Sequence, residues 1–181
     1  MTFVALLRGI NVGAARRLPM AGLRALCLKR RLHRLETYIQ SGNLIVDAEV
    51  DADEVRILLE REIKARFAFN VDVVVRAAAA WQKYIDANPF AGADDVSPNK
   101  LHLYLSRDRP SPGAVKTLEQ RSQDGERMRL AGGALWIDYG ANGVAGSKLS
   151  PMVIDKVCGS PTTGRNWTTV LKIQAMIEAR A

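Results

Sequence analysis

Cysteine and histidine are scarce in this sequence, and their scarcity excludes several kinds of site. The two cysteines, Cys27 and Cys158, form no CxxC pair, so we expect reduced thiols and no disulfide framework. The two histidines, His33 and His102, have no cluster of imidazole, thiol or carboxylate groups at metal-ligand spacing, and neither lies in a nucleophile motif. We therefore expect no metal and no cofactor, and the sequence offers no convincing general base for catalysis.

Long hydrophobic runs are also missing. No apolar stretch approaches the length that crosses a bilayer, and Met1 to Arg8 form too short an apolar segment for a signal peptide. We therefore expect a cytoplasmic protein that does not contact membranes. With 181 residues, of which 48% are hydrophobic, the chain can bury a sizeable core without disulfides or metals.

Acidic residues are absent from the beginning of the chain, where cations are frequent. The first acidic residue is Glu36, and the formal net charge of the chain is +7. The cationic residues before Glu36 are Arg8, Arg16, Arg17, Arg24, Lys29, Arg30, Arg31 and Arg34. Such an uneven charge favours anionic partners, either small molecules or nucleic acid. The alternative is that Lys29 to Arg34 cover the last turn of a helix, where cations suit the helix dipole.

Hydrophobic periodicity in the first part of the chain predicts a βαββαβ order. The predicted strands are residues 3–8, 37–39, 44–47 and 71–76, and the predicted helices run from Pro19 to about Arg31 and from Asp51 to about Phe67. A turn over Gln40–Asn43 joins the second and third strands, because glycine and asparagine tolerate the positive φ of tight hairpins. This order is typical of the ferredoxin-like split βαβ motif.

The second part of the chain partly repeats this pattern. After a helix over residues 77–86, the predicted strands are residues 101–106, 127–130 and 134–139, and the predicted helices are residues 114–120, 151–157 and 166–179. We therefore predict an α+β fold of two ferredoxin-like subdomains of βαββα type, with mostly antiparallel sheets and a C-terminal helix. The expected boundaries are residues 1–76 for the first unit and residues 77–181 for the second.

Five segments together resemble one family. They are Leu7–Gly13, Tyr38–Asn43, Asn88–Phe90, Ser147–Leu149 and Arg165–Val170. In these segments the chain is similar to the bacterial, uncharacterised family called domain of unknown function 1697. The resemblance implies an α+β fold of ferredoxin-like subdomains and no activity. The chain departs from the family at Ala14-Ala15, where members often carry a further glycine and polar residues, and at Thr168, where they often carry asparagine.

Chain direction predicts that the first two turns meet. In a βαββ unit the first and second strands run the same way, so the turns that follow them lie at one end of the sheet. The first and third strands are also adjacent in the ferredoxin-like order, so Arg8 and Asn11 should lie close to Asn43 or Leu44. The candidate ligand-binding residues of this rim are Arg8, Gly9, Asn11, Gly13, Ser41, Gly42 and Asn43. Exposed backbone N–H groups of such turns can hold an anion, and the Arg8 guanidinium adds a forked donor for phosphate or carboxylate.

An alternative explanation exists for the rim. Glycine and asparagine are what tight turns require, and Arg8 could pair internally with a carboxylate such as Asp47. The segment Gly9–Gly13 matches neither the GxGxxG fingerprint nor the P-loop, so a specific nucleotide motif is absent.

A second candidate place is the corner formed by Arg165, Asn166 and Trp167. Asn166 is predicted to cap the last helix, so that an anion there would meet both the Arg165 guanidinium and the helix dipole. The alternative is that Trp167 is a buried anchor for the last helix. Lys148, which follows a glycine turn, is a weaker candidate.

Three kinds of function remain open from these observations. The first is a binding protein for an anionic ligand at the rim near Arg8. The second is an enzyme acting on a small phosphorylated substrate, with Arg8, Asn11 and Arg165 among its positioning groups. The third is an interaction or structural protein whose motifs only build the fold. The residues point to no particular ligand, pathway or oligomeric state.

Overall fold

The computed structural model describes residues 1–11, 17–27, 32–122 and 125–180. The chain divides into two compact units, one formed by Met1–Trp81 with the residues from Ala175 onward and the other by Gln82–Gln174. Each unit contains one four-stranded sheet. Within the described residues, no helix is both long enough and apolar enough to cross a membrane.

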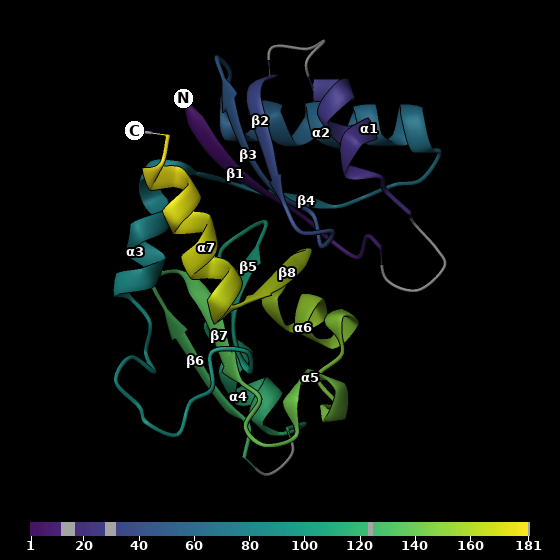
Figure 1. The fold of residues 1–181 in the computed structure, drawn as a ribbon. Helices are drawn as coiled ribbons and strands as arrows, with labels where there is room; N and C mark the ends of the chain where they lie inside the picture. The colour runs from purple at the N-terminus through teal and green to yellow at the C-terminus, as the bar shows by residue number, and fades with distance from the viewer. Residues whose placement is uncertain (12–16, 28–31, 123–124, 181) are drawn as a thin grey trace. The chain divides into compact units, whose positions relative to one another are not determined.

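The first unit is an antiparallel sheet with two longer helices (Figure 1). In chain order its elements are β1 (Thr2–Leu7), α1 (Met20–Cys27), β2 (Leu32–Tyr38), β3 (Asn43–Ala48), α2 (Ala52–Phe67), β4 (Val73–Ala77) and the 3-10 helix η1 (Ala78–Ala80). The strand order is β2-β3-β1-β4, and all neighbours are antiparallel. This order is the ferredoxin-like one, in which the first strand lies between the third and the fourth.

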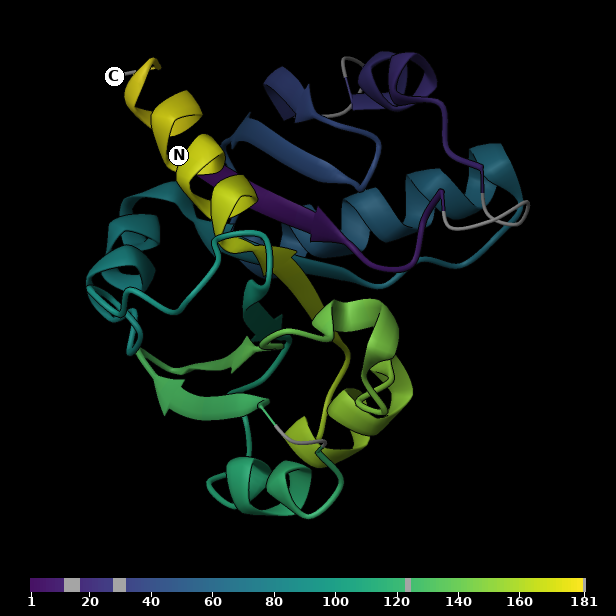
Figure 2. The same ribbon diagram turned by 60° about the horizontal axis from the view of Figure 1, so that its bottom comes forward.

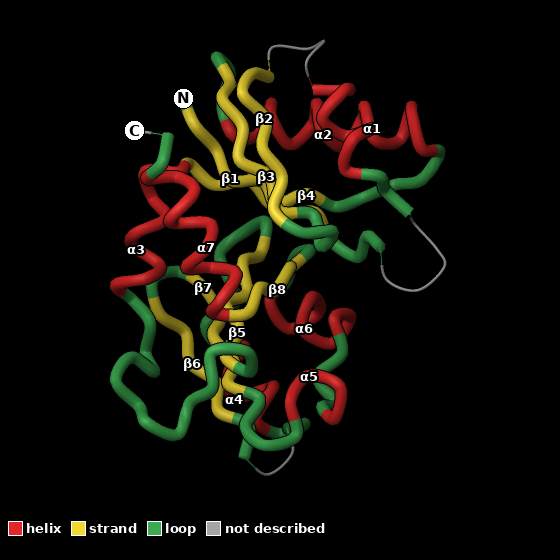
Figure 3. The backbone as a smooth tube through the Cα atoms, in the orientation of Figure 1, coloured by secondary structure: helices red, strands yellow, loops and turns green. Residues whose placement is uncertain are grey.

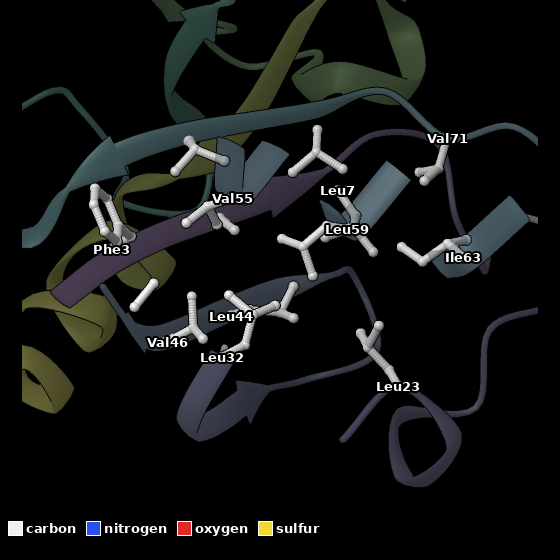
Figure 4. Close-up of a cluster of buried hydrophobic side chains, with 14 of the residues drawn as sticks. Phe3, Leu7, Leu23, Leu32, Leu44, Val46, Val55, Leu59, Ile63 and Val71 are labelled. Atoms are coloured by element: carbon white, nitrogen blue, oxygen red, sulfur yellow. The ribbon is translucent and has the colours of Figure 1, made fainter. Parts of the chain in front are cut away.

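Both helices of the first unit pack on one face of the sheet. Figure 2 shows α2 alongside β1, and Figure 4 shows the side chains between the sheet and the helices. The buried cluster contains Phe3, Ala5 and Leu7 of β1, Leu44 and Val46 of β3, Leu23 of α1, and Val55, Leu59 and Ile63 of α2. The spacing within α2 places its three apolar side chains on one stripe. The residue that precedes α2 is its N-cap, because Asp51 Oδ1 accepts a hydrogen bond from the Glu54 N–H over 2.9 Å.

The second unit repeats the same topology (Figure 3). The elements that follow η1 are α3 (Trp81–Asp86), β5 (Leu101–Ser106), α4 (Ala114–Glu119), β6 (Arg127–Ala131), β7 (Ala134–Asp138), α5 (Gly143–Gly146), α6 (Pro151–Cys158), β8 (Thr162–Asn166) and α7 (Trp167–Glu178). The strand order is β6-β7-β5-β8, again antiparallel throughout. The predicted α+β fold class with two ferredoxin-like subdomains is therefore confirmed.

Strand β8 completes the second sheet and was not predicted from the sequence. Its residues, Thr-Thr-Gly-Arg-Asn, show no apolar alternation, and a glycine lies at its centre. Gly164 pairs with Tyr104 of β5, and a Cβ at Gly164 would lie 2.5 Å from Tyr104 Cε1. The tyrosine ring thus occupies the space above the glycine, which explains why a residue with low strand propensity stands there.

Strand β2 begins earlier than predicted and corrects one interpretation of the cationic segment. Leu32 to Arg34 lie in this strand, so they do not form the last turn of a helix; residues 28–31 lie outside the described residues. The strand is at the sheet edge, and its register shifts between His33 and Glu36. An irregular edge strand tolerates charged residues, so its sequence lacks the alternation that would have identified it.

The side chain of Arg180 binds to the edge formed by β2 and β3. Its guanidinium donates to the backbone oxygen of Arg34 and lies 3.0 Å from Glu36 Oε1 and 3.4 Å from Asp47 Oδ1. The Arg180 side chain is only 5% exposed, so these contacts satisfy a nearly buried cation.

A pair of tyrosines lies in the core of the second unit. The hydroxyls of Tyr104 and Tyr139 are 2.5 Å apart, and Tyr139 packs in the cluster with Leu118, Met128 and Ile154. Burial raises the pKa of Tyr104 to about 12 and also raises the pKa of Tyr139, because ionisation would place a charge in an apolar surrounding.

Gly42 lies where the β2–β3 hairpin touches β1. Its φ is +79°, and a Cβ built there would lie 2.6 Å from Leu7 Cβ and 2.8 Å from Ile10 Cδ1. Its carbonyl accepts a hydrogen bond from the Leu7 N–H over 2.8 Å. The position therefore requires glycine both for its backbone conformation and for the space it leaves.

Replacing Gly42 by alanine is expected to destabilise the chain by about 2 to 4 kcal/mol, because it adds a steric clash to an unfavourable φ. Gly133→Ala is the matched control: Gly133 has a φ of +78° in another hairpin, but nothing lies within 4 Å of its Cβ position. Urea denaturation followed by circular dichroism measures both variants. Equal losses for the two variants would contradict the proposed clash.

The tyrosine pair predicts a loss of stability at alkaline pH. The pKa of Tyr104 rises from 10.0 to about 12 on folding, so the unfolded chain loses this proton first. The contribution of the protonated Tyr104 to the free energy of unfolding is fully present below pH 10.0 and is lost as the pH rises toward about 12. The double variant Tyr104→Phe/Tyr139→Phe should therefore show a flatter decline of the free energy of unfolding above pH 10.0 than the wild type, measured by urea denaturation across this range. Parallel declines would argue against the assignment.

Candidate functional site

The turn after β1 and the β2–β3 hairpin meet at one end of the first sheet. Leu6 pairs with Asn43 in the β1–β3 ladder, and the Leu7 N–H donates to the Gly42 carbonyl just beyond it. The predicted neighbourhood of these two turns is therefore confirmed. Its cause is the antiparallel pairing of β1 with β3, which brings the end of one strand to the beginning of the other.

Asn11 ties the two turns together. Its Nδ2 donates to the Gln40 carbonyl over 2.7 Å and to the Leu18 carbonyl over 3.2 Å, and its Oδ1 accepts from the Leu18 N–H over 2.8 Å. Its φ of 54° lies in the left-handed region, which asparagine tolerates better than most residues. One side chain thus links the hairpin to the segment that precedes α1.

Arg8 is held by the residue that precedes β4. Its backbone N–H donates to the Asp72 carbonyl over 2.9 Å, and its Nη1 lies 3.6 Å from Asp72 Oδ2. The internal pairing considered for Arg8 therefore exists, but with Asp72 instead of Asp47. Asp47 accepts from Thr2 Oγ1 over 2.7 Å at the opposite end of β1. The pairing of β1 with β4 explains the choice, since the beginning of β4 lies beside the end of β1.

The other predicted rim residues shape the turns. Asn43 is 1% exposed, and its Nδ2 donates to the Tyr38 carbonyl over 3.1 Å and to Ser41 Oγ over 3.0 Å. Gly9 has a φ of 61°, which suits glycine at the end of β1. Gly13 lies outside the described residues. Asn43 and Ser41 therefore brace the hairpin from within.

A hollow opens beside the Asn11 link. Its volume is about 430 Å³, and it is lined by Asn11, Arg17, Leu18, Pro19, Met20 and Gln40. The side chain of Arg17 is exposed, and no ion pair to it occurs among the described residues. Helix α1 begins at Met20, with the Leu23 N–H bonded to the Pro19 carbonyl, and its first turn contains no acidic residue. A guanidinium and the positive end of a helix thus border the same hollow.

Ile39 at the tip of the hairpin has a strained backbone. Its φ is 50°, and its side chain is 51% exposed. A β-branched residue in the left-handed region costs on the order of 1 to 3 kcal/mol, and such strain persists only where the surrounding structure imposes it. It immediately precedes Gln40, whose carbonyl receives the Asn11 hydrogen bond.

The remaining candidates belong to the second unit. Arg165 lies in β8 and is 8% exposed; its Nη1 donates to Thr163 Oγ1 over 2.7 Å and to the Gly164 carbonyl over 2.8 Å. Burial lowers the pKa of Arg165 to about 10. Lys148 is exposed in the connection between α5 and α6.

The corner that follows Arg165 is built as a helix start. Asn166 is the predicted cap of α7, since its Oδ1 accepts from the Thr169 N–H over 2.9 Å. Trp167 packs its ring 5.7 Å from that of Trp136, and its N–H donates to the Pro98 carbonyl over 3.1 Å. Both residues thus have structural contacts within this unit.

Sequence reasoning missed part of the lining of the hollow. From the sequence, Arg17 was noted only as one of the cations before Glu36, and Gln40 only as part of a turn. The signal that could have identified Arg17 is its place two residues before Pro19, because a proline at a helix start brings the preceding residues to the helix N-terminus. Among the described residues, no group of histidine, cysteine, aspartate and glutamate side chains could hold a metal ion.

Comparisons with known proteins identify a family and a shared fold. No curated protein matches the chain. A solved structure, that of the conserved bacterial protein SP0830 from Streptococcus pneumoniae, is similar with a TM-score of 0.76 at 20% identity, over 97% of this chain and 98% of that chain. At this identity the likeness concerns the fold alone. A family model described as protein of unknown function (DUF1697) matches residues 1–136, a range that contains the whole rim and ends before Lys148 and Arg165. The chain therefore belongs to the DUF1697 family of proteins of unknown function.

Proposed function

We propose that the protein is a cytosolic binding protein for a small anionic ligand, with a phosphate or carboxylate group, in the hollow at the rim of the first unit. The observation that supports this proposal most is the exposed Arg17 guanidinium beside the start of α1 in a hollow of about 430 Å³. A planar guanidinium binds phosphate and carboxylate through two parallel hydrogen bonds.

The surroundings of Arg17 favour an anion in the same way. Helix starts carry partial positive charge and unsatisfied N–H groups, and α1 has no acidic side chain in its first turn to compete for them. Arg8, at the end of β1, adds positive charge that Asp72 compensates across 3.6 Å. The positive groups that remain for an anion at the hollow are therefore Arg17 and the start of α1.

The size and build of the hollow favour a small molecule over a polymer. Its volume lies toward the lower end of the range of small-molecule pockets, roughly 300 to 1,000 Å³. The hydrogen bonds of Asn11 to Gln40 and Leu18 join two of its walls, which lowers the entropy cost of binding. Nucleic-acid binding by a ferredoxin-like sheet uses aromatic side chains on the central strands, whereas β1 reads Thr-Phe-Val-Ala-Leu-Leu.

A ligand screen with the full chain tests the proposal. Inorganic phosphate, pyrophosphate, citrate and adenosine monophosphate are added to thermal unfolding experiments, and the best compound is titrated by calorimetry. A ligand present at a hundred times its dissociation constant should stabilise the folded chain by about 2.7 kcal/mol. No stabilisation by any of the four compounds would contradict the proposal.

Arg17→Gln is expected to weaken binding of the best compound about tenfold or more, because it removes a charge-assisted hydrogen bond. Arg61→Gln is the matched control: it removes the same charge from an exposed side chain in the middle of α2. Asn11→Ala keeps the charge but releases the hairpin, and should also weaken binding. If Arg61→Gln reduces the affinity as much as Arg17→Gln does, the attraction is general and the hollow is not the site.

A further inference from the structure

The two units place the same pair of segments together. In each unit the loop after the first strand meets the hairpin between the second and third strands, because the first and third strands pair antiparallel. Leu6 pairs with Asn43 in the first unit, and Tyr104 pairs with Leu135 in the second. The place that corresponds to the Arg17 hollow is thus the β5–α4 loop with the β6–β7 hairpin.

A hollow of about 680 Å³ occupies this place. The β5–α4 loop lines it with Arg109, Pro110, Ser111 and Pro112, and the hairpin lines it with Leu130–Ala134. In both units an arginine is followed by a proline shortly before the helix, as Arg17-Leu18-Pro19 and as Arg109-Pro110-Ser111-Pro112. Both loops therefore place an arginine and a proline beside a hollow.

The arginine of the second hollow is available to a ligand. Arg109 is exposed, and among the described residues no side chain forms an ion pair with it. The hairpin opposite it turns at Gly132 and Gly133, with φ of +61° and +78°, and open space surrounds the Cβ position of Gly133. The Cβ position of Gly132, in contrast, lies 2.7 Å from Ala87 Cβ, so a ligand can approach the backbone of this turn closely at Gly133.

The loop that carries Arg109 is held in place by α6 and the segment that follows it. The Ser111 N–H and Oγ both donate to the Cys158 carbonyl, over 3.3 and 3.4 Å. The Asp108 N–H donates to Ser160 Oγ over 3.0 Å, and Ser106 Oγ donates to the Asp108 carbonyl over 2.6 Å. These bonds on both sides of Arg109 fix the backbone before a ligand arrives.

We propose that this second hollow binds an anion that carries an apolar group. Arg109 and the backbone at Gly133 receive the anionic group, while the exposed Pro112 and the 37%-exposed Leu130 contact the apolar group. The chemistry of the ligand extends the proposed function of the first unit, but the residues are different and the two sites can be tested apart.

Nitrogen-15 correlation spectra of the full chain distinguish the two sites, with phenyl phosphate as the probe and inorganic phosphate for comparison. The amides of Gly132 and Gly133 report the second hollow, and that of Gln40 reports the first. We expect saturable shifts at Gly132 and Gly133, with tighter binding of phenyl phosphate than of inorganic phosphate. Arg109→Gln should weaken binding at these glycines on the order of tenfold and leave Gln40 unchanged, and Arg109→Lys should restore part of the loss. The spectrum of each variant also shows whether it is folded.

Each other outcome has a definite meaning. Shifts at the two glycines that do not saturate, or that persist in Arg109→Gln, overturn the second site. An equal effect of the control Arg61→Gln also overturns it, because the attraction is then general. Saturable, Arg109-dependent shifts at the glycines without any response of Gln40 uphold the second site and contradict the proposed function of the first unit. A saturable response of Gln40 without any response of the two glycines supports the proposed function of the first unit and overturns the second site.

Discussion

The antiparallel pairing of each unit's first strand with its third strand is the constraint on which the rest of the structure depends. β1 lies between β3 and β4, and β5 lies between β7 and β8, so each first strand is central in its sheet. Both neighbours of the first strand are antiparallel to it, so the end of the first strand lies beside the beginnings of the other two strands. In each unit this geometry gathers loop residues at one end of the sheet. The Asn11 link, the Arg8–Asp72 pair and the first hollow lie at that end in the first unit, and the second hollow lies at the corresponding end in the second unit.

The same constraint explains how the loop residues divide between structural and exposed roles. Side chains close to the paired strands find partners within the fold. Asn43 bonds to the hairpin backbone, and Arg8 forms an ion pair with Asp72. Arg17 and Arg109 lie further along their loops, nearer the helices, and both side chains are exposed. In these two loops the exposed arginine is thus the one that lies next to the helix start.

The sequence predicted much of the fold because its signals were local. The capping residue Asp51, the stripe of α2 and the alternation of β5 each report on a few neighbouring residues, and the order of the elements then identifies the topology. β8 and the first half of β2 escaped prediction because their stability comes from partners distant in sequence. Tyr104 covers Gly164, and Arg180 binds the edge beside Arg34. Chain direction also predicted which turns meet. It did not predict which side chains there form internal contacts, because the partner of Arg8 depends on β4, some 60 residues away in the chain.

The contact of Arg180 with β2 has a consequence for association between molecules. β2 is an edge strand, and an edge strand offers unpaired carbonyl and N–H groups to any other extended chain. The guanidinium occupies the carbonyl of Arg34 and adds a buried charge beside it, so a foreign strand that paired here would have to displace a cation from Glu36 and Asp47. Arg180 therefore makes strand addition at the β2 edge less favourable at this position.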